Sequence, residues 1–589
     1  MSTSSIALPA ARRRPRALSL PVPAPEIGAL LVLAAVLYLW ALDRNGFANE
    51  YYSAAVRSMS SSWHAFLYGS FDASGIMTVD KPPLALWAQA LSARIFGFSS
   101  WSLLVPQALM GVATVGLAYD LTRRQFGRVA GFTAGLALVL TPITVAIARH
   151  NNPDALLALC CTAALWCVVR AFADGRTRWL VLAGVAVGLG FEAKMAAALL
   201  VVPAIAAAWL WIAPRGRGVA VRQLLAGGAA MTVVGLAWPL LMWLTPAADR
   251  PWISGTSDNS IWSLIFGYNG LGRLFGQSGG PGGGAGGPGG GGGFGGNGLF
   301  GGEPGPLRLL NEALGGQAGW LLGVALVGGA GLLAVTRLRR ADPRSAWLVL
   351  VGGAFLTTAV AFSKAEGIFH PYYVAQLAPL TAALVGAIAA LILGRGTIAR
   401  IVGPAAVFAG VVTEIAILHD NPTSLSWWPG PLAAGGVLAA VGLALVLAPR
   451  MRALVVAAAI AVLLLAPGAW AVQTLGHATN GTFPSGGPAT TAFGGGMGGP
   501  APGGAGTQGG GFGAGGGMFG GDTSTLSEAI AYAKANGGGT IAIASQTAAE
   551  GSLITSGANV VGIGGFSGRE SQVTTEWLAD AVESGKIRY

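Results

Sequence analysis

The chain has 589 residues, of which 53% are hydrophobic and only 10% are charged. With a mean hydropathy of +0.61, this composition excludes an ordinary soluble protein of that length and predicts a chain that folds in a lipid bilayer. The formal net charge is +11, but Lys and Arg lie in short loops between apolar segments rather than on one basic, aromatic-lined face. We therefore expect no nucleic-acid partner.

The N-terminus predicts a basic cytoplasmic segment over 1–26, followed by a transmembrane helix. Four arginines precede the apolar stretch 27–42, namely Arg12, Arg13, Arg14 and Arg16. No small-residue cleavage site follows, so the stretch is typical of an uncleaved helix and not of a signal peptide. By the positive-inside rule, the arginines place the N-terminus in the cytoplasm.

Further apolar segments are long enough to cross the hydrocarbon core, which needs about 20 residues. Counting the first, there are about thirteen, which predicts an all-α polytopic membrane protein over 27–475. The expected spans are 27–42, 102–121, 129–147, 155–173, 179–194, 196–212, 223–244, 317–336, 345–362, 371–393, 400–418, 431–448 and 453–472. Arginines occupy every loop that this order places inside, and the odd count places the C-terminal segment outside.

The loops placed outside are longer and hold most of the Asp, Glu, His and Lys residues of this region. The first covers 43–101, and a Gly-rich one covers 246–316. Because the polar groups gather on this side, any chemistry is expected there, in the extracytoplasmic space.

Two segments, 276–302 and 486–521, are dominated by glycine. Such segments bury too little apolar surface to offset the entropy of ordering, so we predict both to be mobile, the second within a linker over 476–521. Over 522–589, helix-like and strand-like patterns alternate, which predicts a small extracytoplasmic α/β domain.

The first outside loop contains a carboxylate next to a lysine, in Asp80-Lys81-Pro82-Pro83. A carboxylate can activate a hydroxyl group or bind a metal ion, and an ammonium group can hold a phosphate. The prolines fix the backbone after the pair and would aim both side chains. The alternative is a surface ion pair before a helix.

Other outside positions carry groups suited to the same chemistry. Asp154 lies at a helix start, Lys194 ends a span, and Lys364 precedes a segment that contains His370 and Tyr373. Each has a structural alternative: an interaction with the helix dipole, interfacial snorkelling, or an aromatic belt. Since all lie on one aqueous side, together they predict a single site.

At these residues the chain resembles the multi-spanning glycosyltransferases of the protein O-mannosyltransferase and aminoarabinose transferase superfamily, which have the GT-C fold. The pattern is most similar to a bacterial mannosyltransferase-like branch, which combines Asp-Lys-Pro-Pro in the first loop with Gly-rich loops and a small C-terminal domain. The resemblance covers nearly the whole chain. It implies a plasma-membrane enzyme that moves a sugar from a polyprenyl-phosphate carrier to a lipid, polysaccharide or protein acceptor outside the membrane, usually with inversion.

The resemblance also implies roles for individual residues. Asp80 would be a catalytic carboxylate and, as in aminoarabinose transferases, a ligand of a divalent metal ion. Lys81 would bind the carrier phosphate, and Asp154 would match an outward acidic residue after the third span. The residues expected to bind the substrate or the carrier phosphate are Asn49, Tyr52, Lys81, Lys194, Lys364, His370 and Tyr373.

One position departs from the superfamily pattern. The first loop commonly opens with Asp-Glu, and the Asp is taken as the base or as the group that positions the sugar; this chain has Asn49-Glu50. A neutral amide cannot accept a proton at neutral pH. The role of base therefore falls to Glu50, Asp80 or Asp154, and we favour Asp80.

Two other functions are consistent with a membrane protein of this kind. A lipid or sugar transporter would place charged residues near the bilayer midplane, whereas the charges here gather at outside helix ends. A non-catalytic scaffold would use the α/β domain to bind a partner, and Asn49 is the residue that favours it.

Overall fold

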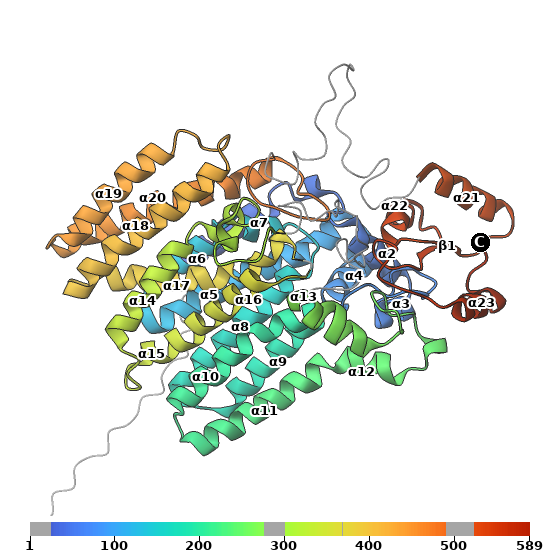
Figure 1. The fold of residues 1–589 in the computed structure, drawn as a ribbon, viewed down its shortest axis with the longest axis horizontal. Coiled ribbons are helices and arrows are strands. Elements are labelled where there is room, and N and C mark those ends of the chain that lie inside the picture. Colours follow the sequence, from blue (N-terminus) through green and yellow to red (C-terminus); the bar gives the residue numbers. More distant parts are fainter. Residues whose placement is uncertain (1–24, 276–300, 368, 490–522) are drawn as a thin grey trace, which may run out of the picture.

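The computed structural model describes residues 25–275, 301–367, 369–489 and 523–589. Most of the predicted cytoplasmic segment and most of both Gly-rich segments lie outside these residues. A bundle of long helices makes up most of the molecule, and a smaller region with short strands lies beside one end of it (Figure 1).

The bundle is built from three stretches of the chain. The first contributes α1 (Pro25–Leu39), α5 (Ser100–Phe126), α6 (Arg128–Val139), α7 (Pro142–Ala148) and α8 (Asp154–Asp174). The second contributes α9 (Thr177–Lys194), η2 (Met195–Val201), α10 (Val202–Ile212), α11 (Arg217–Gly235) and α12 (Ala237–Leu244). The third contributes α14 (Leu322–Thr336), α15 (Pro343–Trp347), η7 (Leu348–Gly352), α16 (Gly353–Lys364), η8 (Pro371–Gln376), α17 (Ala378–Leu393), α18 (Thr397–Asp420), α19 (Pro429–Ala444) and α20 (Pro449–Gln473).

Shorter helices lie in the connecting loops. The first long loop contains η1 (Leu42–Asn45), α2 (Glu50–Ser61), α3 (Trp63–Tyr68) and α4 (Leu84–Phe96). The second contains η3 (Ala247–Asp249), η4 (Ser263–Leu271), α13 (Gly272–Phe275), η5 (Arg308–Leu310) and η6 (Gly315–Gly319). A last turn, η9 (Thr474–Gly476), follows α20.

Among the described residues, eight helices are long and apolar enough to cross a membrane, or nine if α6 and α7, bent by 67° at a break, form one span. The helical, multi-pass character of the protein is therefore confirmed. The number is lower than the roughly thirteen spans predicted. Part of the difference lies in α1, α14 and α19, which have only 15, 15 and 16 residues, because apolar residues counted in those spans lie in turns or short flanking helices.

The rest of the difference lies in the 36-residue candidate span Thr177–Ile212, which turns back on itself. At Met195 the backbone φ is 44°, so α9 cannot continue straight into η2. Arg215, just after α10, donates to the carbonyl of Asp174, just before α9, at 3.1 Å. Both ends of the run thus lie on the same side, and α10 returns antiparallel to α9.

Helices α9 and α11 pack closely along a line of glycines. A Cβ atom on Gly184 would overlap the carbonyl of Gly227, and one on Gly188 would lie 2.8 Å from the carbonyl oxygen of Met231. Small residues let membrane helices approach backbone to backbone. This contact holds α9 in place, and with it Lys194 at the end of α9.

Buried polar side chains fasten the first long loop to the bundle. Arg149, between α7 and α8, donates to the carbonyls of Trp40 (2.6 Å) and Ala41 (3.1 Å) at the end of α1. Asn151 donates to the carbonyl of Asn49 (3.0 Å) and accepts its backbone N–H (2.8 Å). Because buried backbone groups need partners, these bonds fix the start of α2 beside the start of α8.

The C-terminal region is a small α/β unit, as predicted. Strands β1 (Ile541–Ile543) and β2 (Val560–Gly562) pair in parallel, and α22 (Gln546–Ser556) connects them. Two further helices, α21 (Thr523–Ala535) and α23 (Thr575–Glu583), complete the unit.

The C-terminal unit rests on the first long loop. Leu553 and Ile554 of α22 share a buried apolar cluster with Ala54 and Ala55 of α2. Figure 1 shows α22 beside α2, with α21 and α23 farther from the bundle. The two α22 residues would otherwise expose apolar surface, so their burial stabilises this arrangement.

Candidate active site

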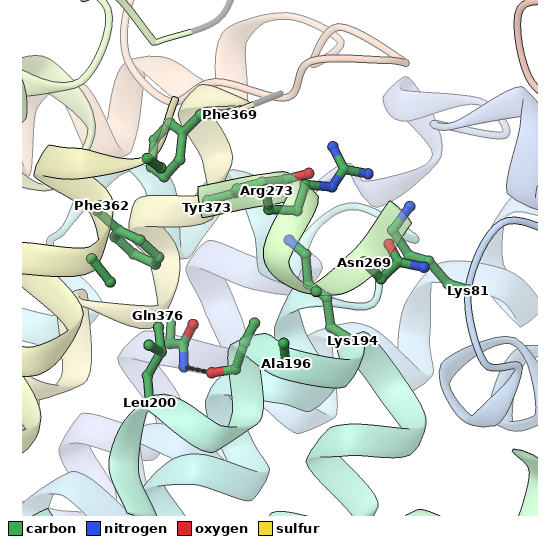
Figure 2. A pocket seen from close by; sticks show the side chains of 14 residues that line it. Lys81, Lys194, Ala196, Leu200, Asn269, Arg273, Phe362, Phe369, Tyr373 and Gln376 are labelled. Atoms are coloured by element: carbon green, nitrogen blue, oxygen red, sulfur yellow. Dashed lines mark hydrogen bonds between the residues drawn. The ribbon is translucent and has the colours of Figure 1, made fainter. Parts of the chain in front are cut away.

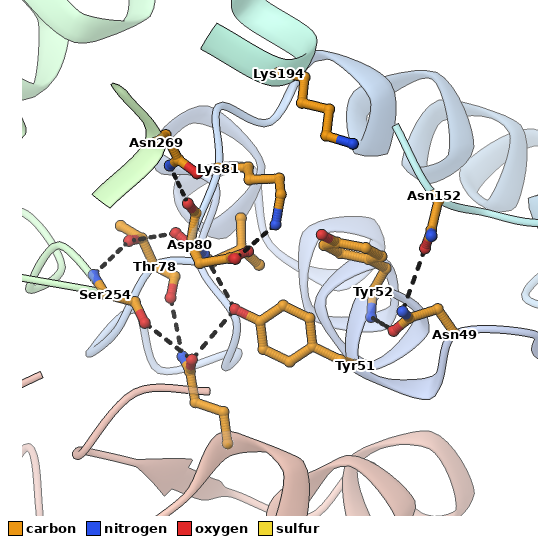
Figure 3. Close-up of polar contacts among 12 residues, drawn as sticks. Asn49, Tyr51, Tyr52, Thr78, Asp80, Lys81, Asn152, Lys194, Ser254 and Asn269 are labelled. Carbon is orange, nitrogen blue, oxygen red and sulfur yellow. Dashed lines mark hydrogen bonds and ion pairs between the residues drawn. The ribbon is translucent and has the colours of Figure 1, made fainter. Parts of the chain in front are cut away.

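Two buried ion pairs form the polar centre of the candidate site. Lys81 Nζ lies 2.6 Å from Asp80 Oδ2, just before α4. Lys194 Nζ, at the end of α9, lies 2.6 Å from Asp154 Oδ1, at the start of α8. The two pairs therefore bring together residues from three regions of the chain, and in Figure 3 the Lys81 side chain lies beside Tyr52.

The second oxygen of each carboxylate has no such partner. Asp80 Oδ1 and Asp154 Oδ2 are both buried, and neither has a hydrogen-bond partner among the described residues. An ionised carboxylate oxygen accepts protons and hydrogen bonds. Each pair thus has one oxygen held by a lysine and a second, buried oxygen that has no partner among the described residues.

A cavity adjoins both lysines. Its described lining includes three basic residues, Lys81, Lys194 and Arg273, and no acidic residue. The other lining residues are mostly apolar or uncharged: Ala196, Ala197, Leu200, Asn269, Gly270, Ala361, Phe362, Ala365, Phe369, Tyr373 and Gln376. In Figure 2 the three basic side chains lie on one side of the cavity, and Phe362 and Leu200 lie on the other. This asymmetry suits a ligand with an anionic head and an apolar tail.

Aromatic rings hold the lysines in position. Lys194 Nζ lies 3.5 Å from the centre of the Tyr373 ring and 5.1 Å from that of Tyr372. Lys81 Nζ lies 5.6 Å from the centre of the Tyr52 ring. Ring faces attract cations, so these contacts favour the charged ammonium groups at the cavity wall. Tyr52 and Tyr373, both predicted from the sequence, thus contact predicted lysines.

The backbone around Asp80 is held from both sides. Its N–H donates to the Tyr51 hydroxyl (3.1 Å), and its carbonyl accepts from Asn269 Nδ2 (2.7 Å). Figure 3 shows Tyr51 and Asn269 on either side of the Asp80 backbone. The direction of the Asp80 and Lys81 side chains is therefore set by residues outside the loop itself.

Asn49 caps a helix in the structure. Its side-chain oxygen accepts the backbone N–H of Tyr52 (3.2 Å), which is the usual bond of an Asn N-cap, and its Nδ2 donates to Asn152 Oδ1 (3.3 Å). Asn49 does not line the cavity. Its described contacts position α2.

Glu50 faces the C-terminal unit. It is half-buried, and burial raises the pKa of its carboxyl group. The pKa of Glu550, on α22, is raised to about 8 by burial and by the charge of Glu50. Glu50 is absent from the cavity lining, and the charged group described beside it is another carboxyl group, that of Glu550.

Of the ten residues predicted for the site, only Lys81, Lys194 and Tyr373 line the cavity. Besides Asn49 and Glu50, the predicted residues outside its described lining are Asp80, Asp154, Tyr52, Lys364 and His370. Lys364 ends α16 with its side chain exposed. His370 contacts Tyr373 (ring centres 5.3 Å apart), and its pKa is lowered well below 6.5 by burial and by the charges of Arg273, Lys81 and Lys194. Its imidazole is therefore neutral at pH 7 and supplies no positive charge to a phosphate.

The resemblance also implied a divalent metal ion at Asp80. The described residues contain no group of three or more His, Cys, Asp or Glu side chains that could hold a metal ion, and one Asp80 oxygen is bound by Lys81. A metal ion at Asp80 stays a prediction, and no step proposed below passes through one.

Sequence reasoning missed Arg273 and Asn269, which belong to α13 and η4 in the long second loop. No pattern in the sequence singled out Arg273, because the predicted outside loops also contain other arginines, such as Arg250 and Arg308. Asn269 carried no signal either, because its role depends on the Asp80 carbonyl, 189 residues away in sequence.

Comparisons with known proteins show the family of the chain. Residues 80–243 match a family model described as "Dolichyl-phosphate-mannose-protein mannosyltransferase", and residues 529–589 match "Putative mannosyltransferase YkcB-like, C-terminal". Two proteins of Bacillus subtilis (strain 168) are similar over 95% of this chain. They are "Putative mannosyltransferase YkcB", 33% identical over 87% of its length, and "Putative mannosyltransferase YycA", 31% identical over 90% of its length.

A solved structure is also similar. The crystal structure of ArnT from Cupriavidus metallidurans bound to undecaprenyl phosphate matches with 17% identity and a TM-score of 0.49, over 76% of this chain and 77% of that chain. The identity with the two Bacillus proteins and their coverage decide the family. The chain belongs to the mannosyltransferase-like membrane glycosyltransferases that carry a YkcB-like C-terminal domain.

Proposed function

We propose that this glycosyltransferase takes a sugar from a polyprenyl-phosphate carrier and transfers it, with inversion, to a hydroxyl group of an extracytoplasmic acceptor. The observation that supports the proposal is the cavity in which Lys81, Lys194 and Arg273 face an apolar wall. A polyprenyl phosphate has these two parts, an anion and a hydrocarbon chain. The acceptor is a lipid, a polysaccharide or a protein.

The basic residues act on the leaving group. As the bond between the anomeric carbon and the phosphate oxygen breaks, the bonding electrons move to the phosphate, which gains negative charge. Lys81, Lys194 and Arg273 offset that charge. Because these groups already line the cavity, little reorganisation is needed when the charge develops.

A carboxylate acts on the acceptor. The acceptor oxygen attacks the anomeric carbon from the side opposite the phosphate, and its proton passes to Asp80 Oδ1, which has no hydrogen-bond partner among the described residues. Attack from the opposite side inverts the anomeric configuration. Asp154 is the second candidate base, since its Oδ2 is equally without a partner there.

The orientation in the membrane follows from the charge distribution along the chain. We place the protein in the plasma membrane, with segment 1–26 in the cytoplasm and the site outside, because arginines gather in the opposite loops. The proposed units are a membrane domain over 27–475, a linker over 476–521 and a C-terminal domain over 522–589.

A transfer assay tests the proposal. Purified protein in detergent is supplied with a panel of radiolabelled polyprenyl-phosphate sugars and with membrane extract as the acceptor source. We expect turnover with a particular sugar, reduced roughly 10²- to 10³-fold in Lys81→Ala and in Asp80→Asn. Lys364→Ala is the matched control, because this lysine is exposed outside the cavity, and it should retain wild-type turnover.

The other outcomes separate the alternatives. Turnover that survives Asp80→Asn but not Asp154→Asn keeps the reaction and moves the base to Asp154. A folded protein that transfers no sugar from any donor contradicts the proposal and favours the scaffold or the transporter.

A further inference from the structure

Gln546, the first residue of α22, reaches from the C-terminal unit into the membrane domain. Its side chain is fully buried. Gln546 Nε2 donates to the carbonyl of Thr78 (2.9 Å), while its Oε1 accepts from the hydroxyl groups of Tyr51 (3.2 Å) and Ser254 (3.0 Å). One amide therefore joins α2, the segment before Asp80 and the second long loop.

These bonds lead directly to the Asp80–Lys81 pair. The Tyr51 hydroxyl that donates to Gln546 also accepts the backbone N–H of Asp80 (3.1 Å). Thr78, two residues earlier, is held by Gln546 at its carbonyl and at its Oγ1 by the N–H of Ser254 (3.0 Å). Without the Gln546 amide, the Tyr51 hydroxyl and the Thr78 carbonyl would be left buried with one partner fewer.

Gln546 is itself held rigidly within its unit. It follows Ser545, whose Oγ accepts the N–H of Ala548 (3.1 Å) and caps α22, and its own N–H donates to the carbonyl of Gly565 (2.9 Å). The helix is then fixed on α2 by Leu553 and Ile554. The amide is presented by a capped and packed helix, and such support makes a positioning contact accurate.

We propose that the C-terminal domain completes the transferase site by supplying Gln546 as a positioning residue, which orients Asp80 and Lys81 through Tyr51 and Thr78. The inference rests on the proposed function. It assigns the C-terminal domain a part in the transfer reaction. Gln546 is not a member of the cavity lining, so it acts only through the residues that it holds.

Transfer kinetics of the full-length chain test the role. Gln546→Leu removes the amide but keeps an apolar side chain of similar size, and Tyr51→Phe removes the hydroxyl group that lies between Gln546 and Asp80. We expect each variant to lower kcat roughly 10- to 100-fold, with the KM for the donor changed little. Because both variants disturb the bond between Tyr51 and the Asp80 backbone, the loss in the double variant should be smaller than the product of the two single losses.

A second measurement does not depend on turnover. Hydrogen–deuterium exchange over residues 76–82 should speed up in Gln546→Leu, since the amide of Asp80 then bonds to a hydroxyl that has lost its anchor. Gln572→Leu is the matched control, because Gln572 is an exposed glutamine of the same domain, and it should leave both exchange and kcat unchanged.

The outcomes separate the two proposals. Wild-type kcat in Gln546→Leu, or losses that multiply in the double variant, would overturn the positioning role while leaving the transferase intact. If wild type transfers no sugar from any donor, the proposed function fails, and exchange alone decides whether Gln546 orders Asp80. Unchanged exchange over 76–82 in Gln546→Leu would refute that ordering.

Discussion

The pair formed by Asp154 and Lys194 permits a quantitative test of the site. Its atoms lie 2.6 Å apart, and the two side chains are only 2% and 9% exposed. At an effective dielectric constant of about 20, the attraction over that distance is about 6 kcal/mol, which largely offsets the cost of burying both charges. In Lys194→Met, Asp154 keeps its burial but loses this attraction. We expect the variant to lose about 3–5 kcal/mol of stability.

The double variant Asp154→Leu/Lys194→Met should recover most of that stability, since no unpaired charge stays buried. Its transfer activity should stay low, because the cavity has lost a cation. Thermal unfolding in detergent and the transfer assay measure the two effects separately. Lys364→Met, at an exposed lysine, is the control for a change of residue type. If Lys194→Met unfolds at the wild-type temperature, or if the double variant is no more stable than Lys194→Met, the reasoning is refuted.

Three further predictions concern the C-terminal contact, helix packing and Asn49. The pKa of Glu550 is raised from 4.5 to about 8 in the folded state, so its contribution to stability is present below about pH 4.5 and is lost as the pH rises through about 8. Protease release of the C-terminal unit should therefore increase over that range. Glu550→Gln should reduce this pH dependence, and the part that stays is that of Glu50, whose pKa is also raised by burial. Gly184→Ala should destabilise the protein by about 1–3 kcal/mol, because its Cβ would overlap the Gly227 carbonyl, whereas Gly228→Ala, whose Cβ would contact nothing, should not; equal melting temperatures of the two variants would contradict the packing. Asn49→Asp should keep the cap of α2 and most transfer activity, since Asp is an equally good N-cap; a large gain in kcat would instead show that the missing carboxylate limits the reaction.

Much of the membrane region was readable from the sequence, because a helix that crosses lipid must satisfy its own backbone and present apolar side chains over its whole length. The boundary between the predicted spans 179–194 and 196–212 was also correct, because Lys194 interrupts the apolar pattern where the chain turns back. The predicted number of spans exceeds the eight or nine candidates in the structure, because α1, α14 and α19 are shorter than the segments predicted there, and apolar residues in the turns beside them have the same composition as residues within a helix.

Only part of the candidate site could be predicted from the sequence. Asp80 and Lys81 are adjacent, so their pairing could be proposed from the sequence, and Tyr373 was named among the residues that line the carrier site. The sequence also assigned Asp154 and Lys194 to this site, but it did not predict that they pair, and it did not name Arg273. Lys194 meets Asp154 across 40 positions, and Arg273 reaches the same cavity from another loop, whereas Lys364, of the same residue type as Lys81 and Lys194, is exposed elsewhere.

Gln546 shows which kind of contact cannot be predicted from the sequence. The sequence by itself determined a membrane domain with polar groups at one set of helix ends and a separate α/β unit, because local composition sets hydropathy and periodicity. Gln546 lies 468 residues from Thr78 in the sequence. Only the tertiary structure decided that its side-chain amide lies 2.9 Å from the Thr78 carbonyl. A buried amide leaves no local pattern, since its partners are chosen by how two separately folded surfaces fit together.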